Sequence, residues 1–323
     1  MCYVHLQDSS VRKKMLTGKQ WISIMEEAVN HGMTGVLLTG GEALTHPDFW
    51  MIYEYLIQKG VEIRLKSNGI LLNKENVERL SKYPPAGIDI SLYGCDSESY
   101  MTVTGKDVYD IVSENVKRCI DTGFNIRLMI TPSAYMMPWT DRVMEYAKSF
   151  GVPVVVNTLL IDAYEESGRE KADFDLPVEE LLRIRKKSNE LFPPKYMPKE
   201  EEERLYGKVT KRPDISEKGL YCSAGRTCFA VCWDGAMLPC LSFPRDIICK
   251  YPLVDGFETA WKQINQAVKN YEVPKKCHSC EYNTKCHYCP TQHGKYSSNN
   301  QCDAKVCEFW QRLYDWHDKL KED

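Results

Sequence analysis

The first 160 residues alternate between short apolar runs and longer segments in which apolar residues recur every three or four positions. The apolar runs predict buried strands at residues 35–39, 61–66, 87–92, 125–130 and 152–157. The amphipathic segments predict helices at residues 19–31, 49–59, 74–82, 108–122 and 140–150. Strands and helices that alternate in this way are typical of βαβ units with a parallel sheet. We therefore expect an α/β fold, either an open doubly wound sheet or part of a (β/α) barrel.

Beyond the predicted sheet, the chain becomes rich in charged residues and then in cysteine. Residues 165–215 carry runs of charge around an amphipathic segment at 176–191, which predicts a helix. A solvated connection between two domains is the interpretation that we prefer, and a docking surface for a peptide is the alternative. A last predicted helix at 306–320 has Phe309, Trp310 and Leu313 on one face, so we expect that face to pack against a core.

Small and polar residues gather where the predicted strands end. In both candidate architectures, ligands bind at the carboxyl ends of the strands. Two adjacent glycines let the backbone approach a ligand closely, and a following Glu can accept from an ammonium group. The alternative is that Gly-Gly forms a turn and Glu42 caps the next helix. The strand ends read Thr39-Gly40-Gly41-Glu42, Ser67-Asn68-Gly69, Ser91-Leu92-Tyr93-Gly94, Thr131 and Asn157-Thr158, and Arg127 lies within the fourth strand.

Most of the 14 cysteines lie beyond residue 220, in a regular spacing. A C-x2-C pair places two thiolates on one turn, where both can face one metal centre, and eight such ligands suggest two centres. Zinc and iron–sulfur clusters both accept four thiolates, so the spacing leaves both open. Disulfides are disfavoured because the chain is long enough to bury a core and starts without a signal-like apolar stretch. The spaced cysteines are Cys222, Cys228, Cys240, Cys277, Cys280, Cys286, Cys289 and Cys307.

Charge and hydropathy exclude two classes of partner. Lys and Arg total 42 against 45 Asp and Glu, and no basic patch indicates a nucleic-acid surface. No run approaches the ~18 apolar residues that a membrane span needs. We therefore expect a cytoplasmic protein without a nucleic-acid or membrane partner.

Together these motifs resemble the radical S-adenosylmethionine (SAM) enzymes that carry a C-terminal SPASM domain. The resemblance rests on Gly40-Gly41-Glu42, on His46-Pro47-Asp48-Phe49 and on Asp89-Ile90-Ser91-Leu92-Tyr93-Gly94, with Ala43 where the family usually has proline. It implies an α/β fold with a partial (β/α)6 TIM-like barrel, followed by a small, irregular, cysteine-rich auxiliary-cluster domain. The expected domains are a partial barrel at 1–164, a charged helical linker at 165–215, and the auxiliary iron–sulfur domain with its last helix at 216–323.

The resemblance also implies a SAM-binding set at the strand ends. Gly40, Gly41 and Glu42 would meet the SAM amino group. Ser91 and Arg127 would hold the carboxylate and ribose end, with Ser67 and Asn68 lining the same pocket. The adenine would lie near Asn157, Thr158 and Leu159. No residue is identified as catalytic.

For the cysteines, the resemblance favours iron–sulfur over zinc and implies two auxiliary [4Fe–4S] clusters. One spacing departs from the family pattern, because two residues rather than the usual three separate Cys286 from Cys289. In addition, Cys302 competes with Cys307 as a ligand. Four further thiols, at Cys95, Cys119, Cys232 and Cys249, are expected to be inert. The implied ligands are Cys222, Cys228, Cys240 and Cys289 for the first cluster, and Cys277, Cys280, Cys286 and Cys307 for the second.

The C-x3-C-x2-C motif that holds the radical SAM cluster in this family is incomplete here. Only its last cysteine is present, as Cys2. Two explanations stay open: the working protein is longer and starts upstream, which we prefer, or the chain is a truncated form with a defective radical site. Codons for C-x3-C-x in the same reading frame immediately before Met1 would establish the first explanation. As given, these 323 residues are expected not to support efficient SAM cleavage.

The resemblance implies an enzyme, a radical SAM oxidoreductase of the peptide- or protein-maturase type. A 5′-deoxyadenosyl radical would abstract hydrogen from a substrate side chain, as in thioether or carbon–carbon crosslinking of a ribosomal peptide. The expected cofactors are SAM, two auxiliary clusters and, in a full-length form, the radical SAM cluster. An electron donor such as flavodoxin or ferredoxin and anaerobic conditions are implied. The alternatives are a non-catalytic iron–sulfur electron-transfer or binding protein, and a sulfatase-maturase-like oxidation, against which Leu241 argues because that reaction's enzymes carry Asp there.

Overall fold

Five parallel strands form the larger sheet of the protein. The computed structural model describes residues 15–160, 174–193, 219–220, 222–282, 286, 288–293 and 302–322. The strands pair in sequence order, β1-β2-β3-β4-β5, so each crossover returns to the adjacent position. The predicted α/β class with a partial barrel is confirmed. The strands are β1 (Gly35–Leu38), β2 (Glu62–Ser67), β3 (Gly87–Leu92), β4 (Ile126–Ile130) and β5 (Val154–Val156).

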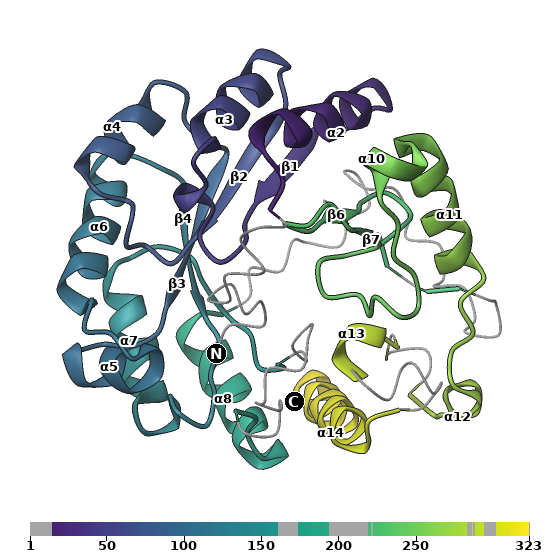
Figure 1. Cartoon of the computed structure of the whole chain (residues 1–323). Helices are drawn as coiled ribbons and strands as arrows, with labels where there is room; N and C mark the ends of the chain where they lie inside the picture. Colours follow the sequence, from purple (N-terminus) through teal and green to yellow (C-terminus); the bar gives the residue numbers. More distant parts are fainter. Residues whose placement is uncertain are drawn as a thin grey trace.

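Helices cover the outer side of this sheet (Figure 1). All the helices predicted within residues 19–150 are present, with ends shifted by one or two residues. The sequence did not predict α5, which buries only Ser99 and Tyr100 and so shows little helical periodicity. Capping boxes begin α2 at Thr17 and α5 at Asp96. The helices are α2 (Gly18–Asn30), α3 (Phe49–Gln58), α4 (Lys74–Ser81), α5 (Ser97–Thr104), α6 (Tyr109–Asp121), α7 (Thr140–Ser149) and α8 (Val178–Leu191), with short 3-10 turns η1 (Ala43–Thr45) and η2 (Met137–Trp139).

The two faces of the sheet differ in chemistry. Alternate residues of a strand point to opposite faces, and the residues that face the helices, such as Ile63, Ile90 and Leu128, are buried in the main core. The opposite set, which we call the inner face, is largely polar. Its rows follow from the strand register, in which Lys66, Asp89 and Arg127 lie side by side and Ser91 lies beside Met129.

The C-terminal region is built from short elements around a hairpin. Strands β6 (Ala230–Val231) and β7 (Met237–Leu238) pair antiparallel. Leu220, Leu238, Phe243 and Val268 belong to a separate small core. The helices are α10 (Pro252–Asp255), α11 (Phe257–Lys269), α12 (Lys275–His278), α13 (Pro290–His293) and α14 (Ala304–Glu322).

Two helices join the C-terminal region to the barrel. Phe309 and Leu313 of α14 are buried in the main core, which confirms the predicted packing face of the last helix. Phe257 and Ile264 of α11 pack with Ile24 of α2. Helix α8 also belongs to the main core through Leu181 and Ile184, so this part of the predicted linker packs against the barrel and is not a solvated bridge.

Among the described residues, no helix combines the length and apolarity needed to cross a membrane.

Candidate functional site

Glu42, at the end of β1, connects two of the predicted ligand loops. Its Oε2 accepts hydrogen bonds from Ser67 Oγ at 3.0 Å and from the Asn68 backbone N–H at 2.8 Å. Its Oε1 accepts from the Leu44 backbone N–H at 3.4 Å, which caps η1. The capping role considered as the alternative is therefore present, and the same carboxylate also holds the loops after β1 and β2 together. Burial raises the pKa of Glu42, although these three hydrogen bonds oppose the shift.

The glycines before Glu42 leave backbone accessible at this point. Gly40 has φ of 138°, in the region that L side chains rarely adopt, and an added Cβ would meet no atom of the described residues within 4 Å. The space beside Gly40 is therefore open to a ligand.

The loop after β2 uses its polar groups internally. Ser67 is buried, and its Oγ accepts from the Gly69 N–H at 3.0 Å in addition to donating to Glu42. Asn115 of α6 donates from Nδ2 to the carbonyls of Gly69 and Ile70 at 2.8 and 3.0 Å. The structure thus gives Ser67 a role in fixing the loop, at the edge where a ligand would bind.

His46 and Asp48, which belong to one of the motifs that carry the family resemblance, anchor the start of α2. The Asp48 N–H donates to His46 Nδ1 at 3.1 Å, so His46 donates from Nε2 to the Leu16 carbonyl at 3.0 Å. Asp48 Oδ2 accepts from the Gly18 N–H at 2.7 Å. Leu16 in turn donates its N–H to the Trp233 carbonyl at 2.8 Å, which links this corner to the C-terminal region. The motif therefore positions the segment before α2 relative to both parts of the protein.

Arg127 on the inner face is paired with Asp89. Its Nε donates to Asp89 Oδ1 at 2.9 Å and its Nη2 to Oδ2 at 2.7 Å, a two-point contact, and Arg64 adds a bond of 3.2 Å to Oδ1. Burial works to raise the pKa of Asp89, but the hydrogen bonds and charges of Arg127 and Arg64 outweigh it and hold this pKa below its ordinary value. The hydrogen bonds to Asp89 raise the pKa of Arg127. Arg127 thus lies one row deeper than Ser91 and is directed at Asp89.

At the end of β5, Thr158 is fixed by α8. Its Oγ1 accepts from Arg185 Nη2 at 3.2 Å, and the residue is buried. The Asn157 N–H donates to the Ile130 carbonyl at 2.8 Å, and Leu159 packs against the main core. The parallel sheet therefore brings the predicted SAM set to one edge, apart from the deeper Arg127.

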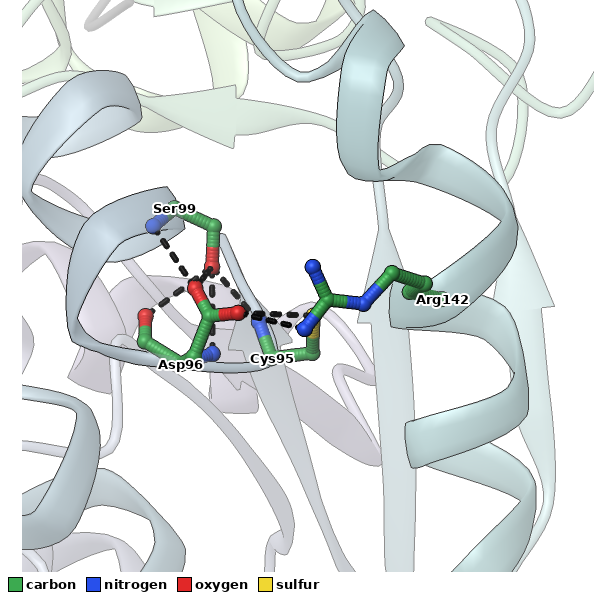
Figure 2. A network of polar contacts seen from close by, with 4 residues as sticks. All are labelled: Cys95, Asp96, Ser99 and Arg142. Carbon is green, nitrogen blue, oxygen red and sulfur yellow. Dashed lines mark hydrogen bonds and ion pairs between the residues drawn. The ribbon is translucent and has the colours of Figure 1, made fainter.

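The loop after β3 carries a network that the sequence analysis did not predict (Figure 2). The Cys95 N–H donates to Ser99 Oγ at 2.9 Å, and Arg142 of α7 donates from Nη2 to Asp96 Oδ2 at 2.7 Å. Burial and then the charge of Asp96 raise the pKa of the Cys95 thiol, with Arg142 opposing, so Cys95 is a weak nucleophile at neutral pH. A groove of about 440 Å³ lies beside it, lined by Cys95, Asp141, Arg142, Glu145, Tyr146 and Lys187. The spacing of Asp96 and Ser99 as a capping box was the available signal.

The first predicted thiol set comes together in space. The thiol of Cys240 is close enough to those of Cys222, Cys228 and Cys289 for their charges to interact, and Cys222 likewise interacts with Cys228 and Cys289. Burial raises the pKa of Cys240 to about 11. Side chains from the hairpin region and from the segment before α13 therefore lie within electrostatic range of one another.

The second set surrounds a cavity of about 240 Å³. The four predicted ligands Cys277, Cys280, Cys286 and Cys307 line it, and Cys302 lines it as well. The Sγ atoms of Cys277 and Cys302 are 3.2 Å apart. Of the thiols expected to be inert, Cys119 and Cys232 are buried, whereas Cys95 and Cys249 are half-buried.

These thiols are of the type that binds a metal centre. Within the described ranges, no three His, Cys, Asp or Glu side chains are arranged around one metal-ion position. Thiols distributed around a cavity of about 240 Å³ leave room for a larger group, and four cysteine thiolates are the usual ligands of a [4Fe–4S] cluster. Cys2, the predicted ligand of the radical SAM cluster, lies outside the described residues.

Known proteins resemble this chain in sequence and in fold. A probable GTP 3',8-cyclase of Saccharolobus islandicus (strain M.14.25 / Kamchatka #1) is 25% identical over 206 residues, 60% of this chain and 65% of that protein. The mycofactocin maturase MftC of Mycobacterium tuberculosis (strain ATCC 25618 / H37Rv) is 24% identical over 169 residues, 51% of this chain and 42% of MftC. The matches span roughly half of the length of the curated relatives, 48% for a probable GTP 3',8-cyclase of Sulfurisphaera tokodaii.

Among solved structures, the likeness extends over most of the chain. SuiB of Streptococcus suis bound to S-adenosylmethionine superposes with a TM-score of 0.62 and 18% identity, over 88% of this chain and 67% of SuiB. The protein anSMEcpe with bound AdoMet and the Kp18Cys peptide gives 0.61 and 16% identity, over 94% of this chain and 88% of anSMEcpe. At these identities the likeness establishes the fold. Residues 1–142 match the sequence model of the Radical SAM superfamily.

Proposed function

We propose that this protein is a radical SAM enzyme that modifies a peptide or protein and carries two auxiliary [4Fe–4S] clusters. The observation that carries the proposal is the collection of the spaced cysteines into two groups, in a chain whose residues 1–142 match the Radical SAM superfamily model. The solved proteins of similar fold support a peptide substrate. The structure of SuiB has been solved with the precursor peptide SuiA, and that of anSMEcpe with the Kp18Cys peptide. MftC, by its name, is a maturase.

In this proposal SAM binds at the strand ends. The backbone at Gly40 and Gly41 would meet the SAM amino group, and Glu42 would keep the surrounding loops in place through Ser67 and Asn68. Ser91 and the end of β5 would border the rest of the cofactor. When reduced, the radical SAM cluster supplies the one-electron cleavage of SAM that yields a hydrogen-abstracting radical.

The auxiliary clusters would complete the oxidation. A substrate that gains one crosslink loses two hydrogen atoms in total. One leaves as an atom taken by the radical, and the second leaves as a proton to solvent and an electron to an auxiliary cluster. A flavodoxin or ferredoxin would provide the electron that starts each cycle. The ligands of the two auxiliary clusters would be those named from the sequence, Cys222, Cys228, Cys240 and Cys289, and Cys277, Cys280, Cys286 and Cys307.

A nucleotide substrate is the second candidate, favoured by the GTP 3',8-cyclase names and by the inner face. Arg64, Lys66 and Arg127 on that face outnumber Glu62 and Asp89, and such an excess of positive charge suits phosphate groups. We prefer the peptide because the fold likeness to SuiB and anSMEcpe covers 88% and 94% of the chain.

Metal analysis and equilibrium binding test the proposal. The protein, reconstituted with iron and sulfide without oxygen, should hold about eight irons per chain. It should bind SAM, and it should bind a cysteine-containing peptide of the Kp18Cys type more tightly than GTP. Zinc without sulfide would refute the iron–sulfur assignment. Binding of GTP and of no peptide would decide for the nucleotide substrate.

A further inference from the structure

Arg185 of α8 is a half-buried cation beside the edge of the sheet where the predicted SAM-binding residues gather, which we call the ligand edge. It follows Leu181 by four positions and precedes Ser188 by three, so it lies on the buried face of the helix. Its Nη2 donates to Thr158 Oγ1 at 3.2 Å, and Thr158 is buried at the end of β5. The guanidinium therefore reaches from α8 to the ligand edge.

Neighbouring cations of α8 have acidic partners, whereas Arg185 has none. Arg183 donates to Asp141 at 2.9 Å and to Glu180 at 2.8 Å. Lys187 forms an ion pair with Asp141 at 3.3 Å. Within the part of the chain that the structure describes, Arg185 forms no ion pair, and its one hydrogen bond goes to a neutral hydroxyl.

Most of the donor groups of the Arg185 guanidinium are unused. Its Nε is buried and has no hydrogen-bond partner among the described residues. Its Nη1 has no such partner either, but this atom is not buried. A charge that is removed from water without a partner is unfavourable, and burial lowers the pKa of Arg185. An anion placed against Nη1 would relieve this unfavourable state.

The inner face next to the ligand edge carries unpaired positive charge as well. Lys66 lies beside Asp89 in the strand register and forms no ion pair with a described residue. Both oxygens of Asp89 already accept from Arg127, and one of them also accepts from Arg64. Because positive charge that lines a binding cleft attracts anions, this part of the protein suits an acidic ligand.

We propose that Arg185 binds a carboxylate of the peptide substrate, an Asp or Glu side chain near the residue that reacts, an inference that rests on the proposed function. A carboxylate can accept two N–H groups of one guanidinium, so Nη1 and the second N–H of Nη2 can hold it at two points. SAM is not the source of this carboxylate in the proposed arrangement. Its charged groups would meet Gly40, Gly41 and Ser91 at the ends of β1 and β3, whereas Arg185 lies beside β5, the last strand of the sheet.

Selection from a random peptide library tests this assignment. The reconstituted protein, saturated with SAM, is incubated without oxygen with peptides that carry one cysteine between randomised positions, and the retained peptides are sequenced by mass spectrometry. Wild type should enrich Asp and Glu at one position by about tenfold, the affinity ratio that a hydrogen-bonded charge pair provides. Arg185→Gln should lose this enrichment and should bind SAM, measured by isothermal titration, with the affinity of wild type.

Two further variants separate substrate binding from a structural role. Arg183→Gln removes a cation of the same helix that already has acidic partners, so it should keep the enrichment. Arg185→Lys keeps the charge but holds a carboxylate at one point only, so its enrichment should lie between those of wild type and Arg185→Gln. Thermal unfolding shows whether each variant is folded.

The outcomes distinguish this inference from the proposed function. Peptides retained by wild type without enrichment of Asp and Glu would overturn the inference, as would an unchanged enrichment in Arg185→Gln or in Arg185→Lys. Loss of SAM affinity in Arg185→Gln would assign the guanidinium to the cofactor and overturn it too. If wild type retained no peptide at all, the proposed function itself would be refuted.

Discussion

Arg127 of β4 and Asp89 of β3 form a two-point ion pair across the inner face, with Nε to Oδ1 at 2.9 Å and Nη2 to Oδ2 at 2.7 Å. The Asp89 side chain is only 6% exposed, whereas that of Arg127 is 40% exposed. The carboxylate is therefore the desolvated partner, and it depends on Arg127 and Arg64 for its charge. Any ligand that engages Arg127 must share it with Asp89.

We expect Asp89→Asn to destabilise the protein by about 1–3 kcal/mol, the range for losing hydrogen bonds to a charged group. The pKa of Asp89 is lowered in the folded state, so its stabilisation is present at neutral pH and is lost as the pH falls through the folded pKa. Urea unfolding of wild type and Asp89→Asn should therefore show a difference in unfolding free energy that is complete at pH 7 and becomes smaller below about pH 4.

Glu54→Gln is the matched control for Asp89→Asn. It removes the ion pair with Arg79, in which both side chains are about half exposed. Such a pair contributes about 0–1 kcal/mol. A pH-independent difference between wild type and Asp89→Asn would contradict the assignment of the stabilisation to the Asp89 charge.

Glu42→Ala should weaken SAM binding by at least about tenfold, which corresponds to ~1.4 kcal/mol. The reason is that the loops after β1 and β2 lose the carboxylate that joins them. Glu42→Gln keeps an oxygen acceptor toward Ser67 and Asn68 and should bind SAM nearly as well as wild type. Isothermal titration on both variants makes the comparison. Equal SAM affinity of Glu42→Ala and wild type would show that Glu42 does not contribute to SAM binding.

Burial raises the pKa of Glu42 in the folded state, and this predicts a second effect of the Gln variant. A carboxyl group with a raised pKa lowers stability as the pH rises from its unfolded pKa, ~4.3, through its folded pKa. Glu42→Gln cannot ionise, so its unfolding free energy should lack this decline. Thermal unfolding between pH 4 and 7 measures it, and identical pH profiles would contradict the burial effect.

Cys240→Ala should reduce the iron content from about eight to about four per chain, because the first group would retain three thiols. Cys232→Ala is the matched control, since Cys232 is buried in the same small core but belongs to neither predicted ligand set. Its iron content should stay at about eight. If Cys232→Ala lost as much iron as Cys240→Ala, the packing of the small core, rather than the Cys240 thiolate, would control cluster retention.

SAM cleavage by the 323-residue chain should stay below one equivalent of 5′-deoxyadenosine per protein after reduction. In the radical SAM enzymes that this chain resembles, the radical SAM cluster needs three cysteines near one another, and Cys2 is the only cysteine before Cys95 in the 323 residues given. Liquid chromatography with mass detection quantifies the nucleoside. Several turnovers per chain would contradict the expectation and show that other groups complete the cluster site.

The sequence by itself predicted the strands, most helices and the α/β class, because buried strands and amphipathic helices leave periodic patterns that depend only on neighbouring residues. It missed α5, since this helix buries only Ser99 and Tyr100 and has no repeating apolar face. It also predicted a solvated linker where α8 packs into the main core, because a charged helix can still hide one apolar side such as Leu181 and Ile184.

For the site, the sequence determined which residue types are present at the strand ends and in the cysteine motifs. Only the tertiary structure decided which of them meet. The strand register placed Arg127 beside Asp89, and the start of α14 brought Cys302 into the same cavity as Cys277. Spacing along the chain cannot encode such contacts, because they join residues dozens of positions apart and depend on how strands pair and helices pack.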